Sequence, residues 1–472
     1  MLDQIVREAA RRFEERLAYV GSDGPLSYRQ LDDRSDRVAG GFTEVGVGLG
    51  SVVALTRASD ADYLVTLAAI SKIGAISVGI NPSLAPAEQE ALLGFLEPDL
   101  VVGADTELPD GRAAPSLAPD PDRIATIVCT SGTTGRPKAA WFRSRELAAV
   151  RDIDLGEGAA SWGGGGPMLA STQFSHIGIS TKLSWYLQTG STLIRVEPWR
   201  ADDVLRAVSE YRISSIGGVA PQMALLLRSP LIDSLDLSCV TSFIVGGALS
   251  TPSLVEQITL RFNASYSIRY SCTESGGVGL GTNPSGGVDE TTASIGRPRP
   301  GVEARLIDPT NGAVLPDGAT GELCVRSAAQ MVGYWKAPED TARALRDGWI
   351  HTGDLARREP NGLYRLRGRI KEQYVRGGYN VSPAEVEAVL SSHPLVREVV
   401  VAPRADDVMG EVGVAIVVPM EPGQPPTLED LRTFGAERLA TWKLPEAIVA
   451  VEALPLTAMQ KLDRAAAARI AR

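Results

Sequence analysis

The chain has 472 residues, of which 44% are hydrophobic and 22% are charged, and its formal net charge is −10. This composition is ordinary for a globular protein, and the length is sufficient for a large domain together with a smaller one. Nucleic-acid-binding proteins need basic surfaces to displace counterions, so an acidic chain argues against a nucleic-acid partner.

The amino-terminal stretch MLDQIVREAARRFEERL has the pattern of an amphipathic helix and lacks the apolar core of a signal peptide. No apolar run approaches the roughly 20 residues that a membrane span requires. The four cysteines show no paired spacing of the kind found in zinc sites or disulfide frameworks. These features predict a protein of the reducing cytoplasm without a membrane span.

Helical and strand patterns alternate along the first 130 residues. We expect helices over 27–42 and 61–74, and strands over 52–55, 76–80 and 124–129. Ser27 and Gln30 have the spacing of a capping box that opens the first of these helices. This alternation is typical of a mostly parallel sheet with helices on its faces.

The pattern changes near GRIK, residues 368–371. Beyond it we expect a helix over 382–393, strands over 398–403, 412–419 and 447–452, a helix opened by Thr427, and a last helix after Lys461. Ser382 and Glu385 have the spacing of a second capping box. We therefore predict an α/β fold, with a large N-terminal domain of parallel-rich sheets flanked by helices, residues 1–369, and a small mobile α+β C-terminal domain, residues 370–472. A junction this short predicts a hinge.

The stretch TSGTTGRPK, residues 130–138, follows the strand expected over 124–129. It does not fit the Walker loop, because Pro137 occupies the position five residues after Gly132 and Ala139 follows Lys138. Glycine backbones, hydroxyls and a lysine nevertheless suit the binding of phosphate, and a polar turn is the alternative.

Lysine is rare in this chain, which otherwise uses arginine for positive charge. The seven lysines are Lys72, Lys138, Lys182, Lys336, Lys371, Lys443 and Lys461. A lysine in such a chain is retained either for its compact point charge or as a solvated surface residue.

The phosphate-loop candidate TSGTTGRPK resembles that of the adenylate-forming superfamily, which includes acyl- and aryl-CoA synthetases, carrier-protein adenylation domains and luciferases. The resemblance continues in order through VGGAL at 245–249, YSCTE at 270–274, GELCVRS at 321–327, HTGDL at 351–355, GRIKEQYVRGGYNVSPAEVE at 368–387 and LPLTAMQKLDR at 454–464. It implies an ATP-dependent acyl-CoA ligase that condenses a carboxylate with ATP, releases pyrophosphate, and transfers the acyl group from AMP to the thiol of coenzyme A. Such chemistry depends mainly on positioning and electrostatics, because two anions must approach each other.

The resemblance also implies the residues that bind the nucleotide. ATP or AMP binding falls to Thr130, Ser131, Gly132, Thr133, Thr134, Gly135, Lys138, Gly246, Gly247, Ala248, Tyr270, Ser271, Cys272, Thr273, Asp354 and Arg369. In the family, Asp354 would bind the ribose hydroxyls, Tyr270 would stack on adenine, Thr273 would hold the α-phosphate, and Glu274 would bind Mg²⁺. Each has a structural alternative: a helix cap or turn for the aspartate, a hinge ion pair for the arginine, a core position for the tyrosine, a solvated charge for the glutamate, and plain turns for the glycines. Ser271 departs from the glycine that is common in the family.

The resemblance assigns catalysis to Lys461, His176, Thr273 and Arg369. Lys461 would bridge the substrate carboxylate and the α-phosphate, although Met459 and Gln460 replace the Ser-Gly that usually precedes this lysine. Rotation about Lys371 would then present a pantetheine tunnel formed by Gly377, Gly378 and Tyr379, for which a hairpin turn is the alternative.

The acid is less defined by the sequence. His176 matches the family's gate beside the acid, and a structural histidine is its alternative. No carboxylate lies between Glu157 and Glu197, which argues against an amino-acid substrate. The glycine-rich stretches 163–166, 216–221 and 275–281 border the acid pocket in the family and favour a fatty, alicyclic or polycyclic acid, and plain turns are their alternative.

Three other functions stay open from the sequence. The acyl group could be loaded onto the phosphopantetheine of a carrier protein, the chain could be an inactive nucleotide-binding regulator, or, least favoured, it could be a luciferase-like oxygenase. The sequence does not define an oligomeric state.

Overall fold

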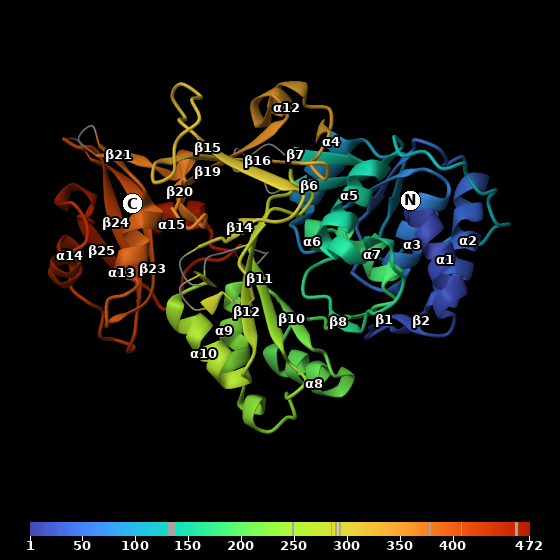
Figure 1. The fold of residues 1–472 in the computed structure, drawn as a ribbon, viewed down its shortest axis with the longest axis horizontal. Coiled ribbons are helices and arrows are strands. Elements are labelled where there is room, and N and C mark those ends of the chain that lie inside the picture. Colours follow the sequence, from blue (N-terminus) through green and yellow to red (C-terminus); the bar gives the residue numbers. More distant parts are fainter. Residues whose placement is uncertain are drawn as a thin grey trace. The chain divides into compact units, whose positions relative to one another are not determined.

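The computed structural model describes residues 1–130, 138–247, 250–284, 286–287, 290–291, 294–376, 379–406, 408–457 and 461–472, with the backbone alone at 130, 371, 379 and 380. Figure 1 follows this chain from its blue amino terminus to its red carboxyl terminus. The chain divides into two compact units, one formed by Met1–Ala304 with Val325–His351 and the other by Arg305–Cys324 with Thr352–Arg472. None of the helices in the described ranges is long and apolar enough to cross a bilayer.

A six-stranded sheet is the centre of the first unit. Its order is β17 (Gly333–Tyr334), β7 (Lys138–Arg143), β6 (Ile124–Thr130), β4 (Ile76–Gly79), β3 (Val52–Leu55) and β5 (Leu100–Val102). β3 pairs in parallel with β4 and β5, and β4 with β6, whereas β7 and β17 add antiparallel strands at one edge. All four residues of β3 are buried, as expected for a parallel strand covered on both faces.

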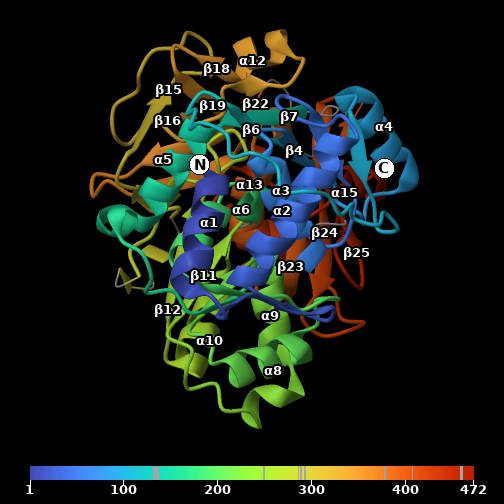
Figure 2. The ribbon, with the colours of Figure 1, turned by 90° about the vertical axis from the view of Figure 1, so that its right-hand side faces the viewer.

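Helices flank the sheets of this unit. The α-helices within residues 1–190 are α1 (Leu2–Phe13), α2 (Tyr28–Glu44), α3 (Ala61–Lys72), α4 (Pro86–Leu96), α5 (Ser144–Leu155), α6 (Ile177–Ser180) and α7 (Leu183–Gln188). Figure 2 shows α1, α2 and α3 side by side. The capping box is confirmed: the Ser27 hydroxyl accepts a hydrogen bond from the Gln30 amide, and the Gln30 side chain accepts one from the Ser27 amide.

Two smaller sheets complete the first unit. One has the order β2 (Gly24–Ser27), β1 (Leu17–Gly21), β9 (Thr192–Ile194) and β8 (Pro167–Leu169). The other has the order β10 (Ser215–Gly218), β11 (Ser242–Gly246), β12 (Ser265–Tyr270), β13 (Leu280–Gly281) and β14 (Arg297–Pro298), with helices α8 (Ala201–Tyr211), α9 (Ala220–Arg228) and α10 (Pro252–Phe262), all visible in Figure 1. Helix α12 (Pro338–Ala344) and strand β18 (Leu345–Arg346) lie in the later segment of this unit.

The second unit contains the α+β elements expected near the carboxyl terminus. They are β20 (Tyr364–Arg369), β21 (Tyr374–Arg376), β22 (Tyr379–Val381), α13 (Pro383–Leu390), β23 (Val396–Asp406), β24 (Gly410–Pro419), α14 (Leu428–Ala436), β25 (Ala447–Ala450) and α15 (Arg464–Ile470). Strands β15 (Val302–Ile307), β16 (Thr320–Ser327) and β19 (Trp349–Arg358) each contribute residues to both units. The predicted boundary between residues 369 and 370 marks the hinge about which the C-terminal domain would rotate during the reaction. This boundary stays a prediction.

The second capping box is wrong. Ser382 precedes α13, but its side chain caps no amide and instead donates to the Arg367 carbonyl at 2.6 Å. Glu385 instead binds Lys443, whose Nζ lies 2.6 Å from Oε2. Both side chains therefore bind partners from distant parts of the sequence. The helix opened by Thr427 does carry its cap, since the hydroxyl accepts from the Asp430 amide.

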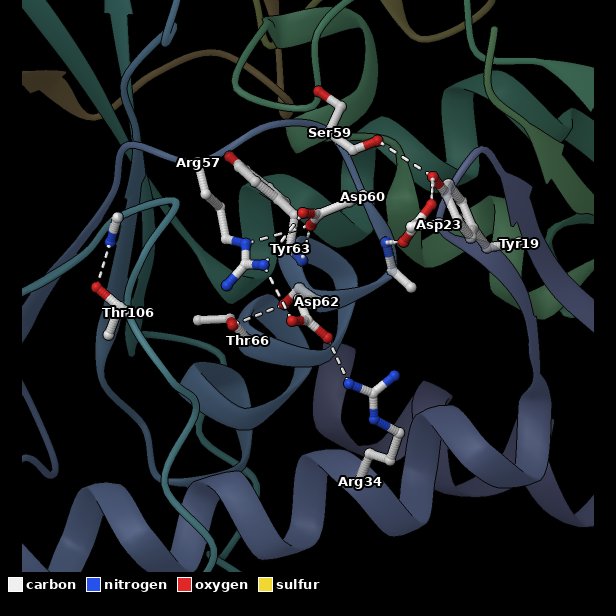
Figure 3. A network of polar contacts seen from close by, with 12 residues as sticks. Tyr19, Asp23, Arg34, Arg57, Ser59, Asp60, Asp62, Tyr63, Thr66 and Thr106 are labelled. Carbon is white, nitrogen blue, oxygen red and sulfur yellow. Dashed lines mark hydrogen bonds and ion pairs between the residues drawn. The ribbon is translucent and has the colours of Figure 1, made fainter. Parts of the chain in front are cut away.

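A buried arginine organises the start of α3 (Figure 3). Arg57 donates through Nε and Nη2 to the carboxylate of Asp60, at 3.2 and 3.1 Å, and through Nη2 to Asp62 at 3.0 Å. Asp60 also caps α3 by accepting from the Tyr63 amide, and Arg34 on α2 pairs with Asp62. The positive charge of Arg57 is thus matched by two carboxylates, as a buried guanidinium requires.

Lys72 and its partners connect the helices α1, α2 and α3, which lie side by side in Figure 2. It lies at the end of α3 and is 2% exposed. Its Nζ lies 2.5 Å from Asp32 Oδ1 and 2.9 Å from Asp36 Oδ1, both on α2. Arg7 on α1 also binds Asp36. Of the seven lysines, this one therefore has an internal role.

We expect Lys72→Met to lower the free energy of unfolding by about 3 kcal/mol, because it leaves two carboxylates without their buried cation. Lys336→Met is the matched control. Lys336 pairs with Glu97 at 2.5 Å on the surface, where such a pair contributes about 0.5 kcal/mol. Urea denaturation of the two variants provides the measurement, and equal losses of stability would contradict the internal role of Lys72.

Candidate functional site

The phosphate-loop candidate connects β6 to β7. Thr130 is the last residue of β6, and its backbone pairs with that of Lys138, the first residue of β7. Residues 131–137, which include the predicted ligands Ser131, Gly132, Thr133, Thr134 and Gly135, lie outside the described residues. Lys138 Nζ lies 3.1 Å from Asp340 Oδ1 and 5.0 Å from the centre of the Tyr334 ring. The lysine that ends the loop is thus positioned by an anion and by an aromatic face.

Tyr334 also contacts the predicted metal ligand. Its hydroxyl donates to Glu274 Oε1 at 2.5 Å, and the Met331 amide donates to the Glu274 carbonyl at 2.7 Å. Burial and the nearby Glu274 carboxylate raise the pKa of Tyr334 well above its ordinary value. The phenol therefore keeps its proton and acts as the donor in this charge-assisted hydrogen bond.

Glu274 has the chemistry that a magnesium site needs. It supplies hard carboxylate oxygens in a half-buried position next to the lysine that ends the phosphate-loop candidate, with Tyr334 between them. Mg²⁺ usually takes one or two protein carboxylates and keeps water and phosphate oxygens as its other ligands. The residues present therefore fit this ion.

The stretch from Tyr270 to Ser275 turns sharply after β12. The Cys272 amide donates to the Ser275 hydroxyl, which itself donates to the Cys272 carbonyl at 2.9 Å. Burial, with the nearby Glu274, raises the pKa of the Cys272 thiol, so this cysteine stays protonated. Ser271, the departure from the family pattern, is exposed, while Tyr270 and Thr273 are half-buried. The turn thus brings Thr273 and Glu274 to the end of β12.

Glycine is required where β11 meets β12. A Cβ atom on Gly246 would lie 2.7 Å from the Arg269 carbonyl oxygen, which is too close for any side chain. Gly247 has φ of 75°, a conformation that favours glycine. Ala248 lies outside the described residues. The backbone geometry alone therefore explains both described glycines, and their contact with a purine stays a prediction.

His176 has a structural partner. It caps the short helix α6, where Nδ1 accepts from the Gly178 amide at 3.3 Å. Thr181, which follows α6, donates to the Gly276 carbonyl at 3.0 Å. The helix that carries the predicted gate is therefore attached to the glycine-rich stretch 275–281.

An anion reaches this region from outside the interval 157–197. Asp154, near the end of α5, forms an ion pair with Lys182 and accepts from Arg299 Nη1 at 2.6 Å. The prediction that this region lacks a carboxylate is therefore incomplete, because tertiary packing brings Asp154 into contact with Lys182. Because two cations already bind Asp154, the argument against an amino-acid substrate still holds.

In the second unit, the predicted ribose ligand and its arginine are paired. Asp354 in β19 is buried and opposes Arg369 in β20. Arg369 Nε donates to Asp354 Oδ1 at 2.7 Å. Asp354 belongs to a strand, so the helix-cap alternative is wrong. The ion pair that was the structural alternative for Arg369 is present, and the contact of Arg369 with the nucleotide stays a prediction.

Lys461 lies in the same unit as Arg369. Lys461 is an exposed residue. Partial burial of its amine lowers its pKa, and the positive charge of Arg369 lowers the pKa further. Met459 and Gln460 lie outside the described residues, as do Gly377 and Gly378 of the predicted tunnel. Lys371, the predicted hinge, lies in a short 3₁₀ turn, Ile370–Glu372, and Tyr379 begins β22, which pairs with β21.

Two residues of this site were missed by sequence reasoning. They are Tyr334 and Asp340, which bind Glu274 and Lys138. The available signal was GYWKAPED, residues 333–340, which follows GELCVRS closely and places an aromatic and two acids after a buried strand.

Comparisons with known proteins identify the family of this chain. A family model described as AMP-binding enzyme matches residues 6–335, and one described as AMP-binding enzyme C-terminal domain matches residues 385–461. An indoleacetate–CoA ligase from Aromatoleum aromaticum is 31% identical, with 97% of this chain and 94% of that protein covered. A fatty acid–[acyl-carrier-protein] ligase from Streptomyces coeruleorubidus is 30% identical, with 93% and 90% covered. The solved structure of an amide bond synthetase from Marinactinospora thermotolerans is similar, with a TM-score of 0.88, 26% identity and 99% of each chain covered.

We expect Arg369→Gln to raise the pKa of Lys461 toward its ordinary value, because the variant removes a neighbouring positive charge. At a fixed pH below that value, more of the amine is then protonated and it reacts more slowly with acetic anhydride. Peptide mass spectrometry across pH measures this change. Arg438→Gln, on the surface of the same unit, should leave the reactivity of Lys461 unchanged. An identical profile in both variants would show that Arg369 does not act on Lys461.

Proposed function

The chain belongs to the AMP-binding enzyme family and is an AMP-forming acid–thiol ligase, and we propose that it activates a carboxylic acid as acyl-AMP and transfers the acyl group to coenzyme A. ATP and coenzyme A are the co-substrates expected of such a ligase. Its fold, a large α/β unit with a smaller α+β unit, is that of its structural relatives.

One observation carries the adenylation half of the proposal. Tyr334 holds the Glu274 carboxylate at 2.5 Å through its hydroxyl and faces Lys138 Nζ at 5.0 Å with its ring. A hard anion and a cation are thus fixed next to each other at the end of the phosphate loop. This pairing suits a triphosphate with its metal ion, because the anion binds the metal and the cation binds phosphate oxygens.

In this proposal, Glu274 would hold Mg²⁺, which when bound would neutralise charge on the phosphates. Thr273 would donate to the α-phosphate, and Tyr270 would stack on the adenine. Asp354 would accept hydrogen bonds from the ribose hydroxyls, since one carboxylate offers two oxygens to a vicinal diol. Arg369, already bound to Asp354, would position that carboxylate and reach the ribose or the phosphates.

Lys461 is proposed to bridge the substrate carboxylate and the α-phosphate. Its pKa is lowered by partial burial and by the nearby positive charge of Arg369. Binding of two anionic oxygens would offset the effects of burial and of Arg369 on the pKa of Lys461, because opposite charges favour the protonated amine. The lysine would then supply charge where the transition state develops it.

The thiol acceptor is proposed to be coenzyme A, with the hinge at Lys371 and the tunnel of Gly377, Gly378 and Tyr379 serving the second half-reaction. A relative that is a fatty acid–[acyl-carrier-protein] ligase supports a carrier-protein phosphopantetheine as the second candidate. Both acceptors present the same thiol. The mass of the thioester product, with each acceptor supplied in turn, separates them.

We expect Lys461→Ala to lower the rate of acid-dependent pyrophosphate release by at least about 100-fold, because it removes a charge that stabilises the transition state. The same variant should still form thioester from a chemically prepared acyl-adenylate, since that half-reaction does not need this charge. Lys443→Ala, which breaks a pair with Glu385 in the same unit, is the control and should retain both activities. Loss of both half-reactions in Lys461→Ala would contradict the assigned role.

We expect Tyr334→Phe to lower kcat/KM for adenylation by about 10-fold or more, because it removes a hydrogen bond to a charged group. The Mg²⁺ concentration needed for half-maximal rate should rise, since Glu274 is no longer held. Tyr28→Phe is the matched control: it removes a buried hydrogen bond to the Ser191 carbonyl, formed at 2.7 Å and remote in sequence from the site. It should reduce stability without changing the Mg²⁺ requirement, and the same shift in both variants would exclude a specific role for Tyr334.

A further inference from the structure

Four charged side chains meet beside the stretch 275–281, and one of them, Arg269, forms no ion pair with the residues that the structure describes. They are Asp154, Lys182, Arg269 and Arg299, here called the Asp154 cluster. Asp154 is 10% exposed at its side chain and binds two cations: Lys182 contacts Oδ2, and Arg299 Nη1 donates to Oδ1 at 2.6 Å. Arg299 Nη2 also donates to the Ile153 carbonyl.

The cluster contains three cations and one carboxylate. Burial and the charge of Arg299 lower the pKa of Arg269, although an arginine keeps its proton. Lys182 and Arg299 overcome the effect of burial and lower the pKa of Asp154, which is therefore ionised. Within the described ranges, the ion pairs of this cluster all use Asp154. The contrast is Arg57, whose single charge is matched by Asp60 and Asp62 (Figure 3).

Arg269 uses only part of its guanidinium on the protein. Its Nη1 donates to the Ser267 hydroxyl and to the carbonyls of Ile268 and Thr282, the last two at 3.2 and 3.1 Å. Among the residues that the structure describes, Nε and Nη2 have no hydrogen-bond acceptor. A half-buried guanidinium with two free donor groups is suited to an anion with two oxygens.

The cluster lies against the part of the chain expected to border the acid. A Cβ atom on Gly277 would lie 3.6 Å from Lys182 Cε, and one on Gly281 would lie 2.7 Å from Arg269 Nη1. Both glycines belong to the stretch 275–281. The hydrogen bond from Thr181 to Gly276 joins this stretch to the helix that His176 caps. A side chain at Gly281 would collide with Arg269, whereas 3.6 Å is an ordinary contact distance, so the cluster lies directly against this stretch at both positions.

We propose that the acid carries a second carboxylate, as a dicarboxylic acid does, and that Arg269 is the residue that recognises it. This inference rests on the proposed function, since it names the substrate class of that site. Lys182 and Arg299 would hold Asp154 between them and leave Arg269 to the ligand. A purely hydrocarbon acid, as the glycine-rich stretches alone favour, would place an apolar chain against a half-buried cation and remove water from it, which is unfavourable.

The test uses the full chain and pairs of acids that share one skeleton. Straight-chain and aromatic dicarboxylic acids are each compared with the monocarboxylic acid and the hydroxy acid of the same length, by pyrophosphate release with ATP and Mg²⁺. The expected result is a higher kcat/KM for at least one dicarboxylic acid than for its partners. Arg269→Met should lower that value by about 10- to 100-fold, the effect of losing a hydrogen-bonded charge, and leave the matched monocarboxylic acid unchanged or improved.

Two further variants separate recognition from folding. Arg269→Lys keeps the charge and should restore part of the preference for the dicarboxylic acid. Arg212→Met removes a surface arginine paired with Asp236 and should change nothing.

The outcomes distinguish the inference from the proposed function. Turnover of monocarboxylic acids without any preference for dicarboxylic acids would overturn the inference and leave the function standing, as would a preference for hydroxy acids. Equal losses for all acids in Arg269→Met would place Arg269 at the reacting carboxylate or in the fold, and would overturn the inference as well. Absence of pyrophosphate release with every acid would instead overturn the proposed function itself.

Discussion

The hydrogen bond between Tyr334 and Glu274 joins two sheets, and the proposed nucleotide site depends on it. Tyr334 belongs to β17, the edge strand of the six-stranded sheet, and Glu274 follows β12 of the five-stranded sheet. The ring of the same tyrosine faces Lys138 at the start of β7. Because burial keeps the phenol protonated, one side chain holds an anion through its hydroxyl and a cation over its face. Tyr334 therefore holds both Glu274, the proposed metal ligand, and Lys138, the lysine that ends the phosphate-loop candidate, before any substrate binds, and such preorganisation would lower the cost of organising charge during the proposed reaction.

Charge compensation explains the ionic contacts of two buried cations, and among the described residues the Asp154 cluster provides a contrast. Lys72 is matched by Asp32 and Asp36, and Arg57 by Asp60 and Asp62. The Lys72 pairs join α3 to α2, and the Arg57 pairs hold the segment before α3 to the start of that helix. The Asp154 cluster differs, since its single carboxylate already serves Lys182 and Arg299. Excess positive charge beside the stretch expected to border the acid favours a ligand that carries a second negative charge.

Interactions that are local in sequence could be predicted, and those that depend on distant partners could not. The capping box of Ser27 and Gln30 spans three residues and was predicted correctly. Ser382 and Glu385 have the same spacing, but the Arg367 carbonyl and Lys443 bind them instead. Family motifs identified Glu274 and Lys138 but not Tyr334, which lies 60 residues from Glu274 along the chain. Asp154 likewise reaches Lys182 only because α5 and the segment between α6 and α7 pack together. Spacing in sequence carries no information about such neighbours.

The formation of acyl-AMP is tested most directly by the exchange of labelled pyrophosphate into ATP. The unmodified protein is assayed with a panel of acids and without any thiol. If acyl-AMP forms first, as the account states, exchange depends on the acid and proceeds without coenzyme A, because the first half-reaction is reversible before the acceptor binds. Exchange that ignores the acid, or that appears only when a thiol is present, would contradict a discrete acyl-adenylate. It would also remove the roles given to Lys461, Glu274 and Tyr334.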